Sequence, residues 1–215
     1  MTDGPPDFDA AFGEQLDALM RWRRDVRHFR TDPVPEHDMH ALLDSVSLAP
    51  SVGHAQPWRL VRVRSGERRA RLADHVDAQI VAAAERYADP VQRDQYHRLK
   101  LHGLREAPEI LAVFSDDRPV AGHGLGIATM PEMLRYSTVM AIHGLWLAAR
   151  ARGIGMGWVS IVDPAALADM LDVPAEWTLI ALLCIGYPAQ SSDTPELEQR
   201  GWQAREPLID RLFER

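Results

Sequence analysis

The stretch LWLAARARGIGMGWVS, residues 145–160, joins the end of a long apolar segment to a short run typical of a strand. From Val139 to Ala149 nearly every residue is apolar, which is typical of a helix buried on all sides. Basic residues in the last turn and Gly153 after it mark the end of this helix. We therefore expect a helix covered either by the rest of the domain or by a second copy of the chain, followed by a strand at 155–161.

Further helices and strands are predicted on both sides of this stretch. Periodic or charged segments predict helices at 10–22, 34–50, within 67–106, at 132–153, 163–171 and 205–215, and apolar runs predict strands at 58–64, 109–115 and 177–188. The glycines and prolines of 119–131 predict a loop. Because strands and helices do not alternate with βαβ spacing, the pattern favours an α+β fold with helices packed around one central sheet. We expect a single domain over 1–215, with a flexible start at 1–9.

Composition narrows the class of protein. The 215 residues include 24 basic and 31 acidic side chains, and the net charge of -7 argues against a general nucleic-acid or anionic-membrane surface. No apolar stretch is long enough for a membrane span, and the N-terminus lacks a signal-peptide pattern. The single cysteine, Cys184, lies in the apolar run LIALLCIGY, where it forms no internal disulfide and makes a poor nucleophile. We expect a cytoplasmic protein.

Several large enzyme classes are disfavoured by missing motifs. The nine histidines are scattered without HExxH or comparable ligand spacing, so no metal site is expected. The glycines of RGIGMGW and GHGLG do not form GxGxxG, and neither GxxxxGK[ST] nor GxSxG occurs.

Three short polar segments remain as candidate binding groups at the ends of predicted elements. In RWRRDVRHF (21–29) three arginines follow a helix, and their planar forks suit a phosphate, although a solvated helix end explains them equally well. APSVGHAQPW (49–58) is a polar turn before a strand, or a turn chosen for its geometry alone. GWVS (157–160) places Ser160 at a strand end, where a structural role is the simpler interpretation.

Taken together, these segments resemble a known family. RRDVRHF followed by APSVGHAQPWR resembles the entry of the flavin-dependent nitroreductase superfamily. KLHGLREAPEILAVFSD, GHGLGIATMPEMLRYS, LWLAARARGIGMGWVS and LCIGYP resemble one branch of it, the 5,6-dimethylbenzimidazole synthases. The similarity runs from about Arg21 to Leu208. It implies a nitroreductase-like α+β fold with a mostly antiparallel sheet, dimeric through the long helix, with each flavin site at the subunit interface.

The resemblance also implies an activity. Members of this branch use reduced flavin mononucleotide (FMN) and molecular oxygen as substrates, and fragment the flavin to 5,6-dimethylbenzimidazole, the lower ligand of vitamin B12, and erythrose 4-phosphate. A separate reductase, drawing on NAD(P)H, is a possible source of reduced flavin. Two alternatives stay open: an FMN-dependent NAD(P)H nitroreductase that retains its flavin, and a flavin-binding protein without catalysis.

Carried over residue by residue, the resemblance assigns Asp25 as the catalytic proton shuttle and Ser160 as a catalytic hydrogen-bonding group near the reacting part of the flavin. The expected flavin-binding residues are Arg23, Arg24, Asp25, Val26, Arg27, Ser51, Gln56, Val159, Ser160 and Arg205, with Arg200 competing with Arg205 for the phosphate. Nearby arginines are expected to hold the pKa of Asp25 low.

The remaining expectations concern a lid over the flavin and two places where the sequence departs from the family pattern. The charged helical region from about Tyr87 to Leu104 is predicted to fold over the flavin and exclude water. Ile127 and Ala128 stand where the family commonly has a basic residue, and Ala55 where a small polar residue is commoner. Contacts from those positions are therefore expected to be weaker.

Overall fold

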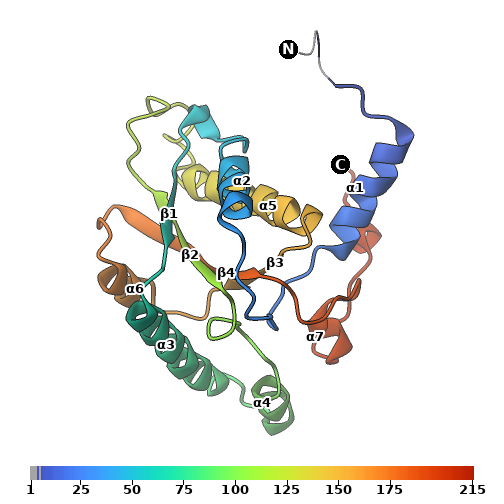
Figure 1. Ribbon diagram of the computed structural model, residues 1–215, viewed down its shortest axis with the longest axis vertical. Coiled ribbons are helices and arrows are strands. Elements are labelled where there is room, and N and C mark those ends of the chain that lie inside the picture. Colours follow the sequence, from blue (N-terminus) through green and yellow to red (C-terminus); the bar gives the residue numbers. More distant parts are fainter. Residues whose placement is uncertain (1–3, 5) are drawn as a thin grey trace.

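A four-stranded antiparallel sheet runs through the centre of the molecule, in the order β1-β2-β4-β3 (Figure 1). The computed structural model describes residues 4 and 6–215. The strands are β1 (Trp58–Arg62), β2 (Glu109–Asp116), β3 (Gly155–Val159) and β4 (Trp177–Gly186). All four predicted strands are confirmed, and so is the α+β class.

Helices cover both faces of this sheet. They are α1 (Ala10–Trp22), α2 (Glu36–Val46), α3 (Gly66–Ala84), α4 (Pro90–His97), α5 (Met133–Ala151), α6 (Pro164–Leu171) and α7 (Glu196–Gln199), with 3₁₀ turns η1 (Val52–His54) and η2 (Leu208–Arg211). The helix predicted at 34–50 is shorter than expected, the one predicted at 205–215 is only a 3₁₀ turn, and α7 was not predicted.

The two faces of the sheet bury separate apolar cores. Ile110 and Phe114 of β2 pack with α3 and α6, whereas Leu111 and Val113 of the same strand pack with α2 and α5. Alternate residues of a strand point to opposite faces, so β2 needs apolar residues at consecutive positions. This is why EILAVFS at 109–115 is a continuous apolar run.

The long helix α5 is not buried on all sides within one chain. Val139 is 41% exposed and Met140 is 40% exposed, because α5 turns its other face toward the sheet and α2. The expectation that the domain itself covers the whole helix is therefore wrong. The alternative, that a second copy covers the exposed face, stays a prediction.

The N-terminal region begins with α1, whose N-cap Asp9 accepts a hydrogen bond from the backbone N–H of Phe12. The flexible start predicted at 1–9 lies partly outside the described residues, since residues 1–3 and 5 are not among them.

Among the described helices, none combines the length and apolarity that crossing a membrane requires.

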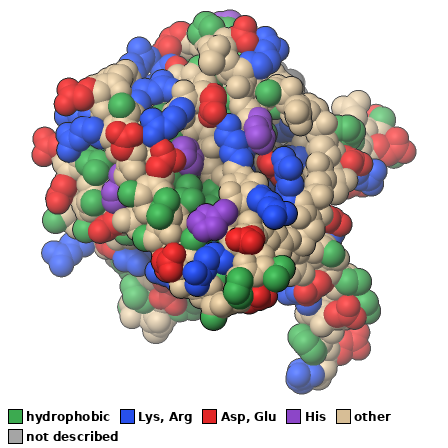
Figure 2. Space-filling view, turned by 90° about the horizontal axis from the view of Figure 1, so that it is seen from below, with side chains coloured by type: hydrophobic (Ala, Val, Ile, Leu, Met, Phe, Trp, Pro, Cys, Tyr) green, Lys and Arg blue, Asp and Glu red, His purple; other side chains and the backbone are tan. Residues whose placement is uncertain are grey.

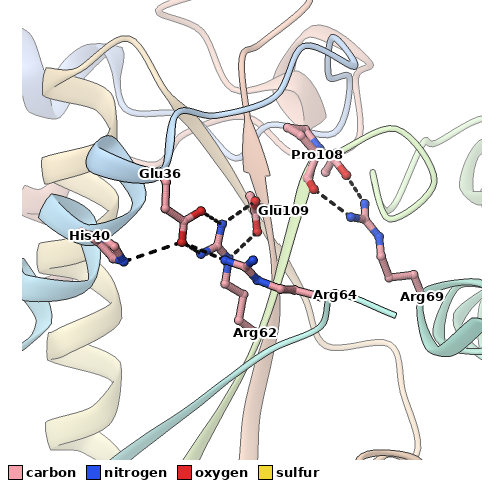
Figure 3. Close-up of polar contacts among 8 residues, drawn as sticks. Glu36, His40, Arg62, Arg64, Arg69, Pro108 and Glu109 are labelled. Atoms are coloured by element: carbon pink, nitrogen blue, oxygen red, sulfur yellow. Dashed lines mark hydrogen bonds and ion pairs between the residues drawn. The ribbon is translucent and has the colours of Figure 1, made fainter. Parts of the chain in front are cut away.

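Charged side chains tie the edge of the sheet to α2. Arg62 on β1 bonds the carboxylates of Glu109 (2.7 Å) and Glu36 (2.9 Å), and Arg64 adds a second bond to Glu36 at 2.8 Å (Figure 3). Hydrogen bonds from Arg62 lower the pKa of Glu36 to about 2. On the face shown in Figure 2, acidic and basic side chains are interspersed, so this face presents no broad field of one sign.

Candidate active site

The arginine segment, residues 21–29, lies along the edge of β3 that does not pair with β4. Asp25 forms a parallel bridge with Met156, and the N–H of Val26 donates to the Met156 carbonyl over 3.0 Å. A side chain at Gly157 would place its Cβ 2.1 Å from the carbonyl oxygen of Val26. Gly157 is therefore needed for the close approach of the two backbones.

Both carboxylate oxygens of Asp25 are held. Oδ1 accepts the backbone N–H of Trp158 over 2.8 Å, and Oδ2 accepts Nε of Arg27 over 3.0 Å. Arg27 also donates from Nη1 to the carbonyl of Lys100 over 3.1 Å, and its side chain is only 13% exposed. Asp25 is thus fixed between a strand and a guanidinium group.

Burial raises the pKa of Asp25 above its ordinary value, and this outweighs Arg27, the Trp158 N–H and Arg23, which act in the opposite direction. The expectation that the arginines hold this pKa low is therefore wrong. The reason is desolvation: the carboxylate of Asp25 packs against a strand, and the loss of its hydration destabilises the charged form more than the neighbouring charges and hydrogen bonds stabilise it.

Arg23, Arg24 and Arg205 gather around one pocket, which Asp193 and Glu198 also line. Burial lowers the pKa of both Arg23 and Arg24, and the guanidinium of Arg205 lowers each further. Within the described chain, no ion pair joins these three arginines to a carboxylate, and the buried Nε of Arg24 has no hydrogen-bond partner. Like charges held together with unused donors suit an anion such as a phosphoryl group.

Of the two competing C-terminal arginines, Arg205 shares this pocket. Arg200 instead lies 3.8 Å from Glu196 on α7 and lines a neighbouring pocket with Asp25 and Arg27. Arg27, expected beside Arg23 and Arg24 as a phosphate ligand, is engaged by Asp25 and does not line the pocket of the other three arginines.

The second pocket, of about 370 Å³, opens beside Asp25. Its described lining comes from the arginine segment and the C-terminal region, namely Arg24, Asp25, Val26, Arg27, His28, Gln190, Ser191, Ser192, Thr194, Glu196, Gln199 and Arg200. The contribution of 190–199 was missed. Pro195 followed by Glu196 and Glu198 was the available signal, since it marks a helix start.

Ser160 lies one residue beyond β3, and Val159 ends that strand as a buried residue. Ser160 is exposed and stands two positions after Trp158, about 7 Å along the chain. Ser160 does not line the described pocket that contains Asp25, and its hydroxyl forms no hydrogen bond to another described residue.

The turn containing Ser51 and Gln56 is built against a different part of the molecule. Ser51 Oγ accepts the N–H of Gln56 over 3.0 Å, and the N–H of Val52 donates to Ser137 Oγ on α5 over 3.0 Å. Gly53 is left-handed, with φ 54°, and a Cβ there would lie 2.7 Å from the Leu125 carbonyl oxygen. The predicted loop at 119–131 therefore packs on this turn.

The positions that depart from the family pattern, Ala55, Ile127 and Ala128, lie in or next to the contact between the turn at 51–56 and the loop at 119–131. Ala55 is buried, and a Cβ at Gly122 would meet its methyl group at 2.8 Å, so a larger residue at 55 would crowd the loop. Ala128 is exposed and Ile127 is half-buried, and neither lines a described pocket with the arginines.

The two halves of the expected site contact opposite ends of α5. Ser137 holds the turn at 51–56, whereas Trp146 donates from Nε1 to the Arg24 carbonyl over 3.2 Å. Nine residues of helix separate these contacts, which is about 14 Å. One chain thus does not bring Ser51 and Gln56 to Asp25.

The region predicted as a lid, 87–104, forms α4 and the turns around it, at the lower end of the domain in Figure 1. The buried ring of Tyr96 lies 5.0 Å from that of Tyr87 and 6.3 Å from that of Trp202, between centroids. Gln95 donates to the Gly201 carbonyl over 2.9 Å. This segment rests on the C-terminal region, and its function as a lid stays a prediction.

Other reactive groups contribute little here. Within the described residues, no group of three or more histidine, cysteine or acidic side chains is placed to hold a metal ion. Burial raises the pKa of the Cys184 thiol to about 12, so this cysteine is not a thiolate nucleophile at neutral pH.

Comparison with known proteins identifies relatives of this chain. A 5,6-dimethylbenzimidazole synthase of Rhodospirillum rubrum is 58% identical over 208 residues, covering 96% of this chain and 97% of that protein. One of Rhodobacter capsulatus is 48% identical, covering 93% and 96% respectively. The crystal structure of an iodotyrosine deiodinase bound to FMN and 3-iodo-L-tyrosine superposes with a TM-score of 0.70 at 25% identity, covering 82% of this chain and 91% of that one. The Nitroreductase family is matched over residues 20–187, and the chain belongs to that family.

Proposed function

We propose that this chain is a 5,6-dimethylbenzimidazole synthase, which fragments reduced FMN with molecular oxygen to 5,6-dimethylbenzimidazole and erythrose 4-phosphate. The observation that carries the proposal is Asp25, a half-buried carboxylate held by Trp158 and Arg27 beside a cluster of arginines. The relatives named for this activity match nearly the whole chain. A cytoplasmic location, which suits the single buried thiol of Cys184, is part of the proposal.

The residues present fit FMN. Arg23, Arg24 and Arg205 supply cationic donors for its phosphate, and the buried unpaired Nε of Arg24 is the clearest sign that a ligand atom is needed there. When bound, reduced FMN supplies the electrons that reduce oxygen and the ring system from which the benzimidazole is made.

Asp25 accepts and returns protons in this proposal. A carboxyl group with a raised pKa gains and loses a proton nearer to neutral pH than an ordinary aspartate, as a shuttle requires. Arg27 and the Trp158 N–H keep its two oxygens in fixed directions. Ser160, two residues further along, supplies a hydroxyl donor near the same centre.

A homodimer completes the site in this proposal. Exposed apolar side chains lie along α5, among them Tyr136 (50%), Val139 (41%) and Met140 (40%). If two α5 helices pack antiparallel about a twofold axis, the N-terminal half of one faces the C-terminal half of the other. The partner's turn at 51–56, including its Ser51 and Gln56, then lies near this chain's Asp25 and bound flavin.

The decisive experiment mixes the purified protein with excess reduced FMN in air and follows benzimidazole and flavin by chromatography. We expect benzimidazole to form as flavin disappears. Asp25→Asn should still bind reduced FMN but form no benzimidazole. Asp32→Asn, which changes an exposed aspartate paired with Arg30, is the matched control and should retain the activity.

Other outcomes of this experiment select the alternatives. A parallel mixture of the protein with NAD(P)H and oxidised FMN completes the test: oxidation of NAD(P)H with intact flavin would identify a conventional nitroreductase, and flavin binding without turnover in either mixture would identify a flavin-binding protein. Normal benzimidazole yield from Asp25→Asn would remove Asp25 from the mechanism. If the protein accepts only flavin that is already reduced, a separate reductase must supply it.

A further inference from the structure

Trp146 on α5 contacts the arginine segment in two ways. Its indole Nε1–H donates to the carbonyl oxygen of Arg24 over 3.2 Å. The guanidinium carbon of Arg23 lies 4.8 Å from the centroid of its ring, within the range of a cation–π interaction. One side chain thus holds the backbone of Arg24 and the charged head of Arg23.

The same ring also borders the aspartate. Trp146 stacks on Trp158, with centroids 6.4 Å apart and planes inclined by 20°. Trp158 is the residue whose backbone N–H donates to Oδ1 of Asp25. Trp146 therefore lies between the phosphate-binding arginines and the support of the carboxylate.

We propose that Trp146 is a positioning residue that orients Arg23 and Arg24 toward the phosphoryl group of the flavin and fixes their spacing from Asp25. This inference rests on the proposed function. Arg23 and Arg24 gather with Arg205 and, in the described chain, no carboxylate forms an ion pair with any of the three. Since like charges repel, an element other than an ion pair must hold Arg23 in place, and the face of Trp146 does so.

A merely structural tryptophan would give a different result from a positioning one. Riboflavin has the ring system and ribityl chain of FMN but no phosphate, so comparing the two ligands isolates the contribution of the arginines. Loss of core packing would weaken both ligands alike, whereas displaced arginines weaken FMN alone.

The test measures dissociation constants of oxidised FMN and of riboflavin for the full-length chain by quenching of flavin fluorescence. In Trp146→Phe, which keeps an aromatic face but lacks the N–H, we expect FMN to bind about tenfold more weakly and riboflavin to change less than about twofold. Trp177→Phe is the matched control, because it removes an indole that faces Arg59 and does not line the pocket of the three arginines, and it should keep the wild-type ratio.

A double-mutant cycle with Arg23→Gln gives a second readout. The cycle uses Trp146→Leu, which removes the aromatic face over Arg23 as well as the N–H, and its effect on FMN binding should become clearly smaller once Arg23 is gone. If Trp146→Phe folds poorly, Trp146→Tyr replaces it, because it also keeps the ring and lacks the indole N–H.

Two results would overturn the inference: an unchanged FMN-to-riboflavin ratio in the folded variant, or additive effects in the cycle. A wild-type protein that binds FMN no better than riboflavin would be a separate result. It would reject the proposed phosphate site itself, and with it the positioning of Trp146.

Discussion

Arg27 donates to the carboxylate of Asp25 and, over 3.1 Å, to the backbone carbonyl of Lys100, which lies 73 positions further along the chain. The guanidinium that orients the proposed proton shuttle thus also holds the segment proposed to close over the flavin. Lysine offers a single ammonium in place of the guanidinium fork and cannot reproduce all these contacts.

Arg27→Lys should therefore loosen the segment around Lys100 while leaving the domain folded. We expect amide hydrogen exchange at 98–102 to accelerate about tenfold, with little change in β2 and β4. Arg98→Lys, an exposed change in the same segment, is the control and should leave exchange unaltered. Equal exchange in both variants would show that Arg27 does not hold this segment.

The raised pKa of Asp25 predicts how stability depends on pH. Because the folded state favours the protonated carboxyl, this residue stabilises the protein most below its unfolded pKa, and the contribution is lost as pH rises through the folded pKa. The Tm of the wild type relative to Asp25→Asn should therefore fall from about pH 3 toward neutrality. Thermal unfolding at several pH values measures this, and a difference that grows with pH would contradict it.

Gly157→Ala should be strongly destabilising. Its Cβ would lie 2.1 Å from the carbonyl oxygen of Val26, so the arginine segment would have to leave β3. We expect a loss of about 2–3 kcal/mol in the free energy of unfolding, together with weaker flavin binding. Gly66→Ala is the matched control: nothing lies within 4 Å of a Cβ there, and its stability should be unchanged or slightly raised in denaturant unfolding.

The two C-terminal arginines should differ in their effect on phosphate binding. Arg205→Gln removes a member of the pocket shared with Arg23 and Arg24, and we expect FMN to bind about tenfold more weakly with riboflavin unaffected. Arg200→Gln, which changes the arginine near Glu196, should alter the FMN-to-riboflavin ratio much less. The reverse order, measured by flavin fluorescence, would assign the phosphate to Arg200.

A site shared between two chains predicts complementation. Gln56→Ala and Arg205→Gln should each lower benzimidazole formation strongly in homodimers. Mixed dimers of the two variants contain one site with both changes and one with neither, so co-expressed, differently tagged chains should recover up to about half of the wild-type activity. No recovery in isolated mixed dimers would indicate that each site is built within one chain.

Much of the fold follows from the pattern of apolar residues. The continuous runs of β2 and β4 and the signals around α6 predict elements close to those in the structure. The same pattern misled for α5, since an apolar side chain fits an interface as well as a core, and sequence does not separate the two. The helix α7 was missed because four residues give too short a period to recognise.

For the site, the segments could be predicted but not their grouping. Arg23, Arg24 and Arg27 are equivalent in the sequence, yet Arg27 pairs with Asp25 while the others meet Arg205. The direction of the Asp25 pKa shift was missed because neighbouring charges are visible in a sequence and desolvation is not. Nothing in the sequence marks Trp146 as a positioning residue, because its contacts depend on which segments pack against α5 in the fold.

The bridge between Asp25 and Met156 has a consequence for solubility. β3 is one of the two edge strands of the sheet, and an uncovered strand edge invites pairing with other chains and aggregation. The segment around Asp25 and Val26 covers part of that edge, so residues proposed to bind the flavin also protect the edge of the sheet from pairing with other chains. Any substitution that releases this segment from β3 would therefore expose a strand edge prone to self-association.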